Sequence, residues 1–313
     1  MADPTFTLQT PDGAVVVVHR WLPDDEPKAV VQIAHGMAEH AARYAHVAKA
    51  LNDRGYAVYA NDHRGHGQTA VTEDELGFFA ESRGWARVLD DLYRLNQRIG
   101  EEHPGLPVLL FGHSMGSFLT QQYLFTFPAT IRGAVLSGST RHLGPDLEAG
   151  AVLARAEIKR QGPRGHSELL QALAFGQFNK AFAPNRTDFD WLSRDPEQVD
   201  AYIEDPRCGF LVTNRFWLDL FSGARVIRQT ERLESIPLEM PIYVFSGAED
   251  PVGEAGTGVE RLLAAYERAG LHQVTSRLYP GGRHEMVNEI NRDEVIADLG
   301  DWLDRTVADL APR

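Results

Sequence analysis

Short apolar runs rich in β-branched residues alternate along the chain with longer stretches in which apolar residues recur every three or four positions. The apolar runs occupy residues 29–34, 56–60, 107–111, 133–137, 242–246 and 274–279. The amphipathic stretches occupy residues 44–54, 85–102, 118–127, 259–269 and 294–307. Near-continuous apolar strands separated by helices are typical of a mainly parallel sheet covered on both faces. The pattern therefore predicts an α/β fold.

The beginning of the chain has a different pattern. Residues 5–9 and 14–21 flank the turn Pro11-Asp12-Gly13. A strand pattern on either side of such a turn predicts a β-hairpin.

The alternation also breaks between residues 140 and 212. This segment is polar and helix-like, is interrupted by proline and glycine, and has no pattern of a buried strand. Because strands resume at Ile242, we interpret the segment as a cap inserted over the carboxyl ends of the strands, where open α/β sheets bind ligands. The expected organisation is a core of residues 1–139 and 213–313 with a helical cap of residues 140–212.

Composition narrows the function classes. The formal net charge of −13 argues against a nucleic-acid partner, which needs a basic stripe, and against tight docking on anionic lipid. The single cysteine, Cys208, allows neither an internal disulfide nor a cysteine-based zinc site and suits a reducing compartment. No apolar run approaches the roughly 20 residues of a membrane span, and residues 1–10 lack the features of a secretory signal. We therefore expect a cytoplasmic protein without integral membrane association.

The pentapeptide Gly112-His113-Ser114-Met115-Gly116 carries the clearest chemical signal. It lies between the apolar run 107–111 and the helix-like run 118–127. A serine between two glycines at a strand-to-helix turn is typical of a nucleophile elbow, in which the tight turn lifts the hydroxyl clear of the sheet and tolerates no Cβ on its flanks. The motif predicts a serine hydrolase with Ser114 as nucleophile.

A serine nucleophile needs a histidine base and a carboxylate that orients it, in the chain order Ser, Asp/Glu, His for this fold class. Four histidines follow Ser114. His142 and His166 fall in the expected cap, and His272 precedes the last strand, at the wrong end of the sheet. His284 directly follows that strand, so we predict that it is the base.

The acid should follow the preceding strand, 242–246. Asp250 and its neighbour Glu249 both lie in the loop after that strand. Pro251 fixes the turn after Asp250, and an offset of one residue would aim the other carboxylate toward solvent. We favour Asp250 and keep Glu249 as the alternative.

Acyl transfer also needs donors aimed at the developing oxyanion. One is expected to be the backbone N–H of Met115, the residue after the nucleophile. The other should come from the loop of residues 35–40 after the strand 29–34, where Met37 is the expected donor and Gly36 allows close approach. Only the two amides are required, because the methionine side chains can simply pack.

The motif Asp62-His63-Arg64-Gly65-His66-Gly67 resembles a metal-binding sequence at first sight. Metal ligation requires converging donors with a supporting outer shell, and two histidines in a glycine-rich turn are more often structural. We predict no metal and no cofactor.

Several blocks together identify a family. They are His35-Gly36-Met37-Ala38-Glu39-His40-Ala41-Ala42-Arg43-Tyr44, Asp62-His63-Arg64-Gly65-His66-Gly67, Gly112-His113-Ser114-Met115-Gly116, Ser193-Arg194-Asp195-Pro196, Asp205-Pro206-Arg207-Cys208-Gly209 and His284-Glu285. In this order they resemble the α/β-hydrolase family of monoacylglycerol lipases and bacterial lysophospholipases, which is grouped with the S33 serine aminopeptidases. The chain departs from the family pattern at Ala38 and Ser117, where relatives commonly have glycine.

The resemblance implies an eight-stranded, mainly parallel sheet with a helical cap and a triad of Ser114, Asp250 and His284. It also implies that Glu39 and Arg43 lie at the polar end of the pocket, where related lipases hold a glycerol head group. The alternative for Glu39 and Arg43 is a mutual ion pair that supports the loop, since residues four apart share a helix face.

The aromatic residues of the cap allow two interpretations. Phe175, Phe178 and Phe182 recur at helical spacing, with Phe189 and Trp191 nearby. They either pack the cap onto the core, which we favour, or form a wall for an acyl chain.

Together these features predict a carboxylic-ester hydrolase that cleaves a single-chain acyl ester, a monoacylglycerol or a lysophospholipid, through an acyl-enzyme. The expected partner is this small molecule, with transient contact between the cap and lipid surfaces. One alternative is a serine peptidase or amidase, which would use Asp188, Asp190 and Asp205 to hold an amine. A second is a non-catalytic receptor or scaffold, which a missing triad residue would favour.

Overall fold

The computed structural model describes residues 5–141 and 147–310. Eight strands form one sheet in the order β1-β2-β4-β3-β5-β6-β7-β8. The strands are β1 (Thr5–Gln9), β2 (Val15–Trp21), β3 (Ala29–Ala34), β4 (Tyr56–Asn61), β5 (Val108–His113), β6 (Gly133–Ser137), β7 (Ile242–Gly247) and β8 (Val274–Tyr279). The pairs β1–β2 and β2–β4 are antiparallel and all others are parallel. The predicted hairpin and the eight-stranded, mainly parallel sheet are confirmed.

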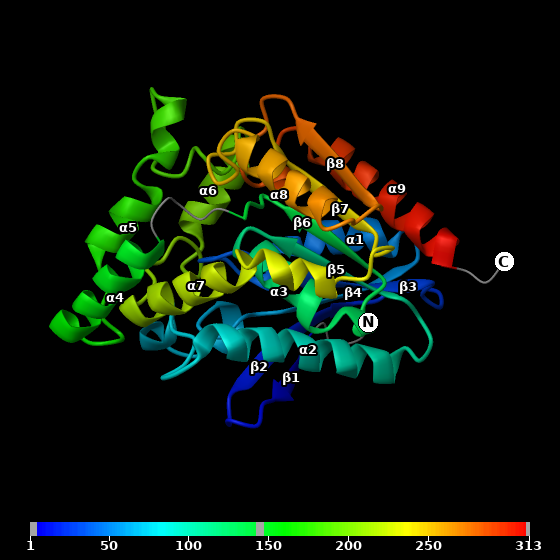
Figure 1. The fold of residues 1–313 in the computed structure, drawn as a ribbon, viewed down its shortest axis with the longest axis horizontal. Helices are drawn as coiled ribbons and strands as arrows, with labels where there is room; N and C mark the ends of the chain where they lie inside the picture. The colour runs from blue at the N-terminus through cyan, green and yellow to red at the C-terminus, as the bar shows by residue number, and fades with distance from the viewer. Residues whose placement is uncertain (1–4, 142–146, 311–313) are drawn as a thin grey trace.

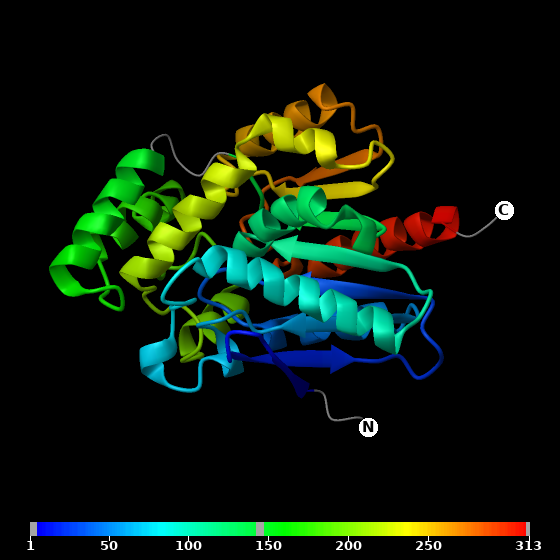
Figure 2. The ribbon, with the colours of Figure 1, turned by 60° about the horizontal axis from the view of Figure 1, so that its bottom comes forward.

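Helices cover both faces of this sheet (Figures 1 and 2). The α-helices are α1 (Ala45–Asn52), α2 (Gly84–Glu102), α3 (Met115–Thr126), α4 (Leu147–Gln161), α5 (Glu168–Phe175), α6 (Pro196–Glu204), α7 (Asn214–Ile227), α8 (Thr257–Arg268) and α9 (Arg292–Leu310). The 3₁₀ helices are η1 (Ala41–Tyr44), η2 (Gly67–Thr69), η3 (Glu73–Glu75), η4 (Pro128–Thr130), η5 (Phe178–Phe182), η6 (Thr230–Ser235) and η7 (Met286–Asn288).

Alternate strand residues point to opposite faces of the sheet, and both faces are packed. On one face, residues of α1 and α9 pack against strand positions that include Val31 and Phe111. On the other face, residues of α2, α3, α7 and α8 pack against positions that include Leu110 and Leu136. Both faces of the central strands are therefore buried, which explains why their sequences are almost continuously apolar.

The segment interpreted as a cap contains helices in its described part. α4, α5, η5 and α6 lie beyond the carboxyl ends of the parallel strands, at the left of Figure 1, and this part has no strand. Helix α7, for which the sequence pattern gave no prediction, packs against α4 of the cap and also against α2 and α3 of the core. α7 therefore joins the two parts.

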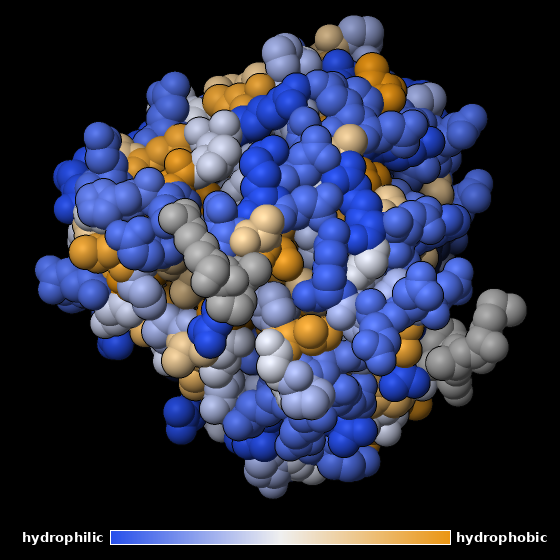
Figure 3. Space-filling model, turned by 90° about the vertical axis from the view of Figure 1, so that its right-hand side faces the viewer, coloured by the Kyte–Doolittle hydropathy of each residue, from blue (hydrophilic) through white to orange (hydrophobic). Residues whose placement is uncertain are grey.

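Among the described residues, no helix is both long and apolar enough to cross a membrane. The face at the far end from the cap is mostly hydrophilic, and its apolar residues form small, separate spots (Figure 3).

Each predicted helix differs from the structure at one end or both. The stretch 44–54 divides into the 3₁₀ helix η1 and the shorter α1. Helix α3 begins at Met115, directly after Ser114, whereas the pattern placed its start at Phe118. Its first residues include Gly116 and Ser117, which carry no apolar period, so the pattern could not reveal them.

Candidate active site

The turn between β5 and α3 holds Ser114 in a strained conformation. Its φ of 51° and ψ of −119° lie outside the regions that residues with a side chain ordinarily adopt. The backbone N–H of Ser114 donates to the carbonyl of Ser137 on β6 at 2.9 Å. Because the main chain reverses within one residue, Ser114 lies at the carboxyl edge of the sheet, at the amino end of α3.

The glycines on either side of Ser114 allow this turn. A Cβ on Gly116 would lie 1.9 Å from the carbonyl oxygen of Ala34, and a Cβ on Gly112 would lie 2.3 Å from that of Gly116. Real Cβ atoms do not approach backbone oxygens this closely. The two glycines therefore let α3 pack directly against β3 and β5, as the elbow motif requires.

His284 and Asp250 come together at the same edge of the sheet. His284 follows β8 and Asp250 follows β7, and the His284 Nδ1 lies 2.9 Å from the Asp250 Oδ1. Asp250 also accepts from the Ser246 hydroxyl and from the Val252 backbone N–H, each at 2.9 Å. Both side chains are almost fully buried, so the carboxylate is fixed on three sides.

The surroundings of His284 leave its Nε2 as the atom available to a nucleophile. Within the described residues no hydrogen bond joins Ser114 to His284 in this structure. The His284 ring packs between His113, with ring centres 4.8 Å apart, and Trp191, at 5.1 Å. A hydrogen bond between a nucleophile and its base commonly tightens only when substrate is bound.

The pair shifts the pKa of both groups toward the charged forms. Burial alone would lower the pKa of His284, but the Asp250 carboxylate and its hydrogen bond outweigh burial, and the pKa is raised. Burial alone would raise the pKa of Asp250, but His284, Ser246 and the Val252 amide outweigh it, and the pKa is lowered. Asp250 is therefore a carboxylate that stabilises a protonated imidazole.

The alternatives for acid and base lie elsewhere. Glu249 is exposed, and so is His166 in the cap. His272 precedes β8 at the opposite edge of the sheet from Ser114. His142 lies outside the described residues.

The segment that follows β3 approaches Ser114 closely. A Cβ built on Gly36 would lie 3.3 Å from the Cβ of Ser114. The Met115 amide is at the first position of α3, where helical N–H groups have no partner in the helix. Met37 is half-buried and packs against the core. For these two residues, no hydrogen bond from the backbone N–H is found within the described part of the chain, so both amides remain available.

Glu39 and Arg43 form an ion pair within a larger network. The Glu39 carboxylate accepts from the Gly36 backbone N–H at 2.5 Å and from the Tyr44 hydroxyl at 2.9 Å. Arg43 donates to Glu39 at 2.7 Å and, through two nitrogens, to both oxygens of Glu285 at 2.7 Å each. These contacts favour the alternative in which the pair supports the loop.

The sequence reasoning missed the role of Glu285. This buried carboxylate is adjacent to His284, and the charge and hydrogen bonds of Arg43 hold its pKa well below the usual value, at about 2, against the effect of burial. Glu285 thereby connects the loop that carries the histidine to the segment after β3. The sequence feature that could have revealed it is its place directly after His284, in the block His284-Glu285 that contributes to the family resemblance.

The histidine motif after β4 builds a buried scaffold. The His63 backbone N–H lies 2.9 Å from the Nε2 of His35, and His66 Nδ1 lies 2.9 Å from the carbonyl oxygen of Arg64. Asp62 accepts from the backbone N–H groups of Ala41 and Gln68. This network holds the segment after β3 against the loop that follows β4.

The aromatic residues of the cap meet in part above His284. Phe175 and Phe178 contact each other and the indole of Trp191, which lies against the His284 ring. Phe182 instead packs under the Arg283 guanidinium at 4.2 Å. The predicted stripe is therefore divided, and its first two members pack against Trp191 beside the histidine.

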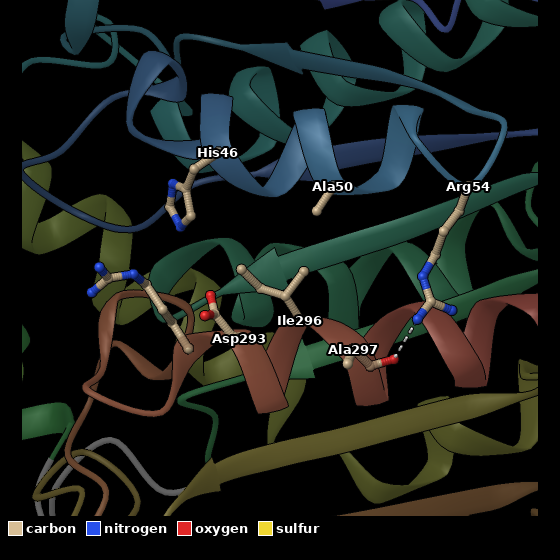
Figure 4. Close-up of a pocket in the computed structure, with 7 residues that line it drawn as sticks. His46, Ala50, Arg54, Asp293, Ile296 and Ala297 are labelled. Carbon is tan, nitrogen blue, oxygen red and sulfur yellow. Dashed lines mark hydrogen bonds between the residues drawn. The ribbon is translucent and has the colours of Figure 1, made fainter.

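A separate groove of about 320 Å³ lies between α1 and α9 (Figure 4). His46, Ala50 and Arg54 face Ile296 and Ala297 across it. None of the predicted site residues lines it. Arg54 is already paired with Asp301 and Asp304 of α9.

Comparisons with known proteins identify the relatives of this chain. Residues 25–291 match the family model described as serine aminopeptidase, S33. A monoacylglycerol lipase from Mycolicibacterium smegmatis is 32% identical over 93% of both chains. The human monoglyceride lipase is 26% identical, over 96% of this chain and 90% of its own.

Among solved structures, a thermostable carboxyl esterase from Bacillus coagulans in complex with glycerol superposes with a TM-score of 0.90. It is 30% identical, and the match covers 98% of this chain and 99% of the esterase.

Proposed function

Because the chain belongs to the serine aminopeptidase S33 family of α/β-hydrolases, and is a serine carboxylic-ester hydrolase, we propose that it hydrolyses monoacylglycerols through Ser114, Asp250 and His284. The observation that carries the proposal is the buried His284–Asp250 pair at the edge of the sheet that also holds the strained Ser114.

In the first half of the proposed reaction, the Ser114 hydroxyl attacks the ester carbonyl while Nε2 of His284 takes its proton. Asp250 accepts from Nδ1–H and stabilises the imidazolium as it forms. The negative charge that develops on the carbonyl oxygen is bound by the amides of Met37 and Met115. His284 then gives the proton to the leaving glycerol oxygen, and the acyl group remains on Ser114.

In the second half, water replaces the alcohol. His284 removes a proton from water, which attacks the acyl carbon, and the same proton returns to the Ser114 oxygen when the fatty acid leaves. The raised pKa of His284 supports this exchange, since the imidazole holds the transferred proton while Asp250 faces it.

The proposed substrate class rests on the relatives. A monoacylglycerol lipase and a glycerol-bound carboxyl esterase are 32% and 30% identical to this chain over nearly its full length. Aromatic contacts among Phe175, Phe178 and Trp191, next to His284, offer an apolar surface for a single acyl chain. A lysophospholipid has the same single-chain geometry and is the second substrate to test.

We also propose that the cap touches lipid surfaces transiently, as a route for such a substrate. Val152 on α4 and Leu169 and Leu173 on α5 are exposed, Leu173 to 66%. Isolated apolar side chains on adjoining cap helices suit brief contact, and the net negative charge opposes lasting attachment. The single cysteine supports a cytoplasmic location.

The amidase alternative has less support. Asp190 already accepts from the backbone and hydroxyl of Thr187, and Asp205 is bonded to His40. Asp188 is exposed. Asp190 and Asp205 therefore have separate partners, and among the described residues no interaction joins the three carboxylates into one site for an amine.

The test is a hydrolysis panel with a covalent probe. The wild type should cleave monoacylglycerol in preference to lysophospholipid, short aryl ester and aminoacyl substrates, and a fluorophosphonate should label it once. Ser114→Ala should lose the label and at least about a thousandfold in kcat. Full turnover by Ser114→Ala would refute the mechanism, and a preference for aminoacyl substrates would favour the amidase.

A further inference from the structure

Three side chains that commonly bind transition metals converge where the loop after β3 meets the cap. They are His40, Asp205 and Cys208, and one possible ligand atom from each lies within 4.8 Å of the others. His40 is the last residue of the loop between β3 and η1, whereas Asp205 and Cys208 lie in the loop between α6 and α7. None of the three takes part in the proposed hydrolysis.

Backbone contacts hold the two loops together independently of these side chains. The carbonyl of Ala38 accepts from the Gly209 backbone N–H and from the Tyr202 hydroxyl, each at 2.9 Å. The Cys208 N–H donates to the Asp205 carbonyl at 2.9 Å. Hydrogen bonds to main-chain carbonyls therefore hold the loops that carry the three donors next to each other, as a binding site requires.

The three donors differ in what they already contact. His40 Nε2 lies 2.8 Å from Asp205 Oδ2. The Cys208 thiol is buried, with 8% of the residue exposed, and within the described residues no hydrogen bond to it is found. The Asp205 side chain is 33% exposed, so the cluster opens to solvent on its side.

The charges around the cluster favour a cation. Glu39, Glu285 and Arg43 all act electrostatically on the Cys208 thiol. Because the two carboxylates share one guanidinium, this group has a net charge of minus one. The other nearby arginine, Arg207, directs its guanidinium to the carbonyls of Gly67 and Ala70. With Asp205 the surroundings have a net negative charge before the thiol ionises.

We propose that His40, Asp205 and Cys208 form a binding site for a zinc-like divalent cation, with a water molecule as the fourth ligand on the exposed side. One imidazole nitrogen, one carboxylate oxygen and one thiolate are the ligands that Zn²⁺ takes in proteins, at about 2.0 to 2.3 Å. The expectation of no cysteine-based zinc site counted cysteines alone, and the structure adds a histidine and an aspartate from distant segments.

Binding is balanced by proton transfer. The Cys208 thiol releases its proton to solvent as the sulfur–metal bond forms, and burial, which raises the pKa of this thiol, keeps it protonated until then. The ion takes the place of the proton between His40 Nε2 and Asp205. In a neutral imidazole this proton moves to Nδ1. Affinity should therefore rise with pH.

The consequence is a reversible link between the cap and the loop that follows β3. The ion binds only the folded arrangement of the two loops, so it should stabilise the protein by mass action. At a free Zn²⁺ concentration about a hundred times Kd, we expect a rise in Tm of about 5 °C.

The test is titration of the full chain with Co²⁺, a coloured substitute for Zn²⁺, under reducing conditions. We expect one equivalent to give tetrahedral ligand-field bands and a sulfur-to-cobalt charge-transfer band, both abolished by excess Zn²⁺. Because Cys208 is the only cysteine, the charge-transfer band can arise from this site alone. Cys208→Ser should abolish it, and His40→Ala and Asp205→Asn should each weaken Co²⁺ binding at least about tenfold.

Controls separate this site from the catalytic one and from surface binding. Ser114→Ala should bind Co²⁺ like the wild type, so the result does not depend on the proposed hydrolysis. His166→Ala, which removes an exposed cap histidine, should also bind normally. Melting curves without metal verify that each variant folds, and Asp205→Asn preserves side-chain size. Absence of the charge-transfer band, or unchanged affinity in folded His40→Ala and Asp205→Asn, would overturn the proposal.

Discussion

At the residue scale, the proposed chemistry depends on what surrounds each side chain. Glu249 and Asp250 are adjacent and chemically similar, yet one is exposed and the other is fully buried against His284. The turn at Pro251 and the order of the triad were enough to favour Asp250 from sequence. The contacts with Ser246 and the Val252 amide were not predictable, because they depend on how the loop folds back on itself.

The pH dependence of turnover should reveal this pair. Only neutral His284 can accept the serine proton, and its raised pKa moves the acid limb of kcat/KM above pH 6.5. Asp250→Asn should lower kcat by about 10⁴-fold and shift the limb of the residual activity to lower pH. Stopped assays with an aryl ester from pH 5 to 9 measure both effects, with the exposed Glu249→Gln as matched control. The opposite ranking of the two variants would assign the acid to Glu249.

The network of Glu39, Arg43 and Glu285 yields a second prediction. If it supports the oxyanion loop, Arg43→Ala should lower kcat/KM about equally for a monoacylglycerol and for a short aryl ester, because the Gly36 amide loses its fixed partner. Glu285→Gln should act in the same direction, since it removes the negative charge of one carboxylate that is paired with Arg43. A loss of tenfold or more confined to the monoacylglycerol would instead favour head-group recognition.

At the scale of elements, the strands were more predictable than the helices. Buried strands such as β3 and β6 match their predicted bounds, because an apolar run has clear ends. Helix α3 begins earlier than predicted, since its first turn is specified by close packing on β3 and not by periodicity. The link that α7 provides between cap and core arises from tertiary contacts and has no local signal.

The glycine at the start of α3 gives a prediction at this scale. Gly116→Ala should force α3 away from β3, since its Cβ would lie 1.9 Å from the Ala34 oxygen. The free energy of unfolding should fall by about 3 kcal/mol or more. Gly100→Ala is the matched control in α2, where nothing lies within 4 Å, and should stabilise by about 0.5 to 1 kcal/mol. Urea denaturation measures both, and equal stability of the two variants would contradict the packing argument.

At the scale of the whole molecule, the folded core contains histidines that it keeps neutral. Burial lowers the pKa of His35 well below its usual value, that of His63 to about 3, and those of His66 and His113 to about 4. The glycine-rich motif suggested a structural role for two of them, but their burial beside His35 results from the pairing of β3 with β4. Hydrogen bonds between His35 and His63 connect the segment after β3 to the loop after β4.

These histidines should make the fold sensitive to acid. Their pKa values are lower in the folded than in the unfolded state, so as pH falls below 6.5 the unfolded chain binds more protons, and the free energy of unfolding decreases until the folded-state pKa values are reached. Each histidine contributes a slope of up to about 1.4 kcal/mol per pH unit. Urea denaturation at pH 7, 6 and 5 should therefore show a steep loss of stability.

His66→Asn retains a donor for the Arg64 carbonyl and cannot titrate, so the pH dependence of its unfolding free energy should be shallower by up to one proton. The exposed variant His166→Asn should match the wild type. Constant stability of the wild type between pH 7 and 5 would show that these histidines are not held neutral by the fold.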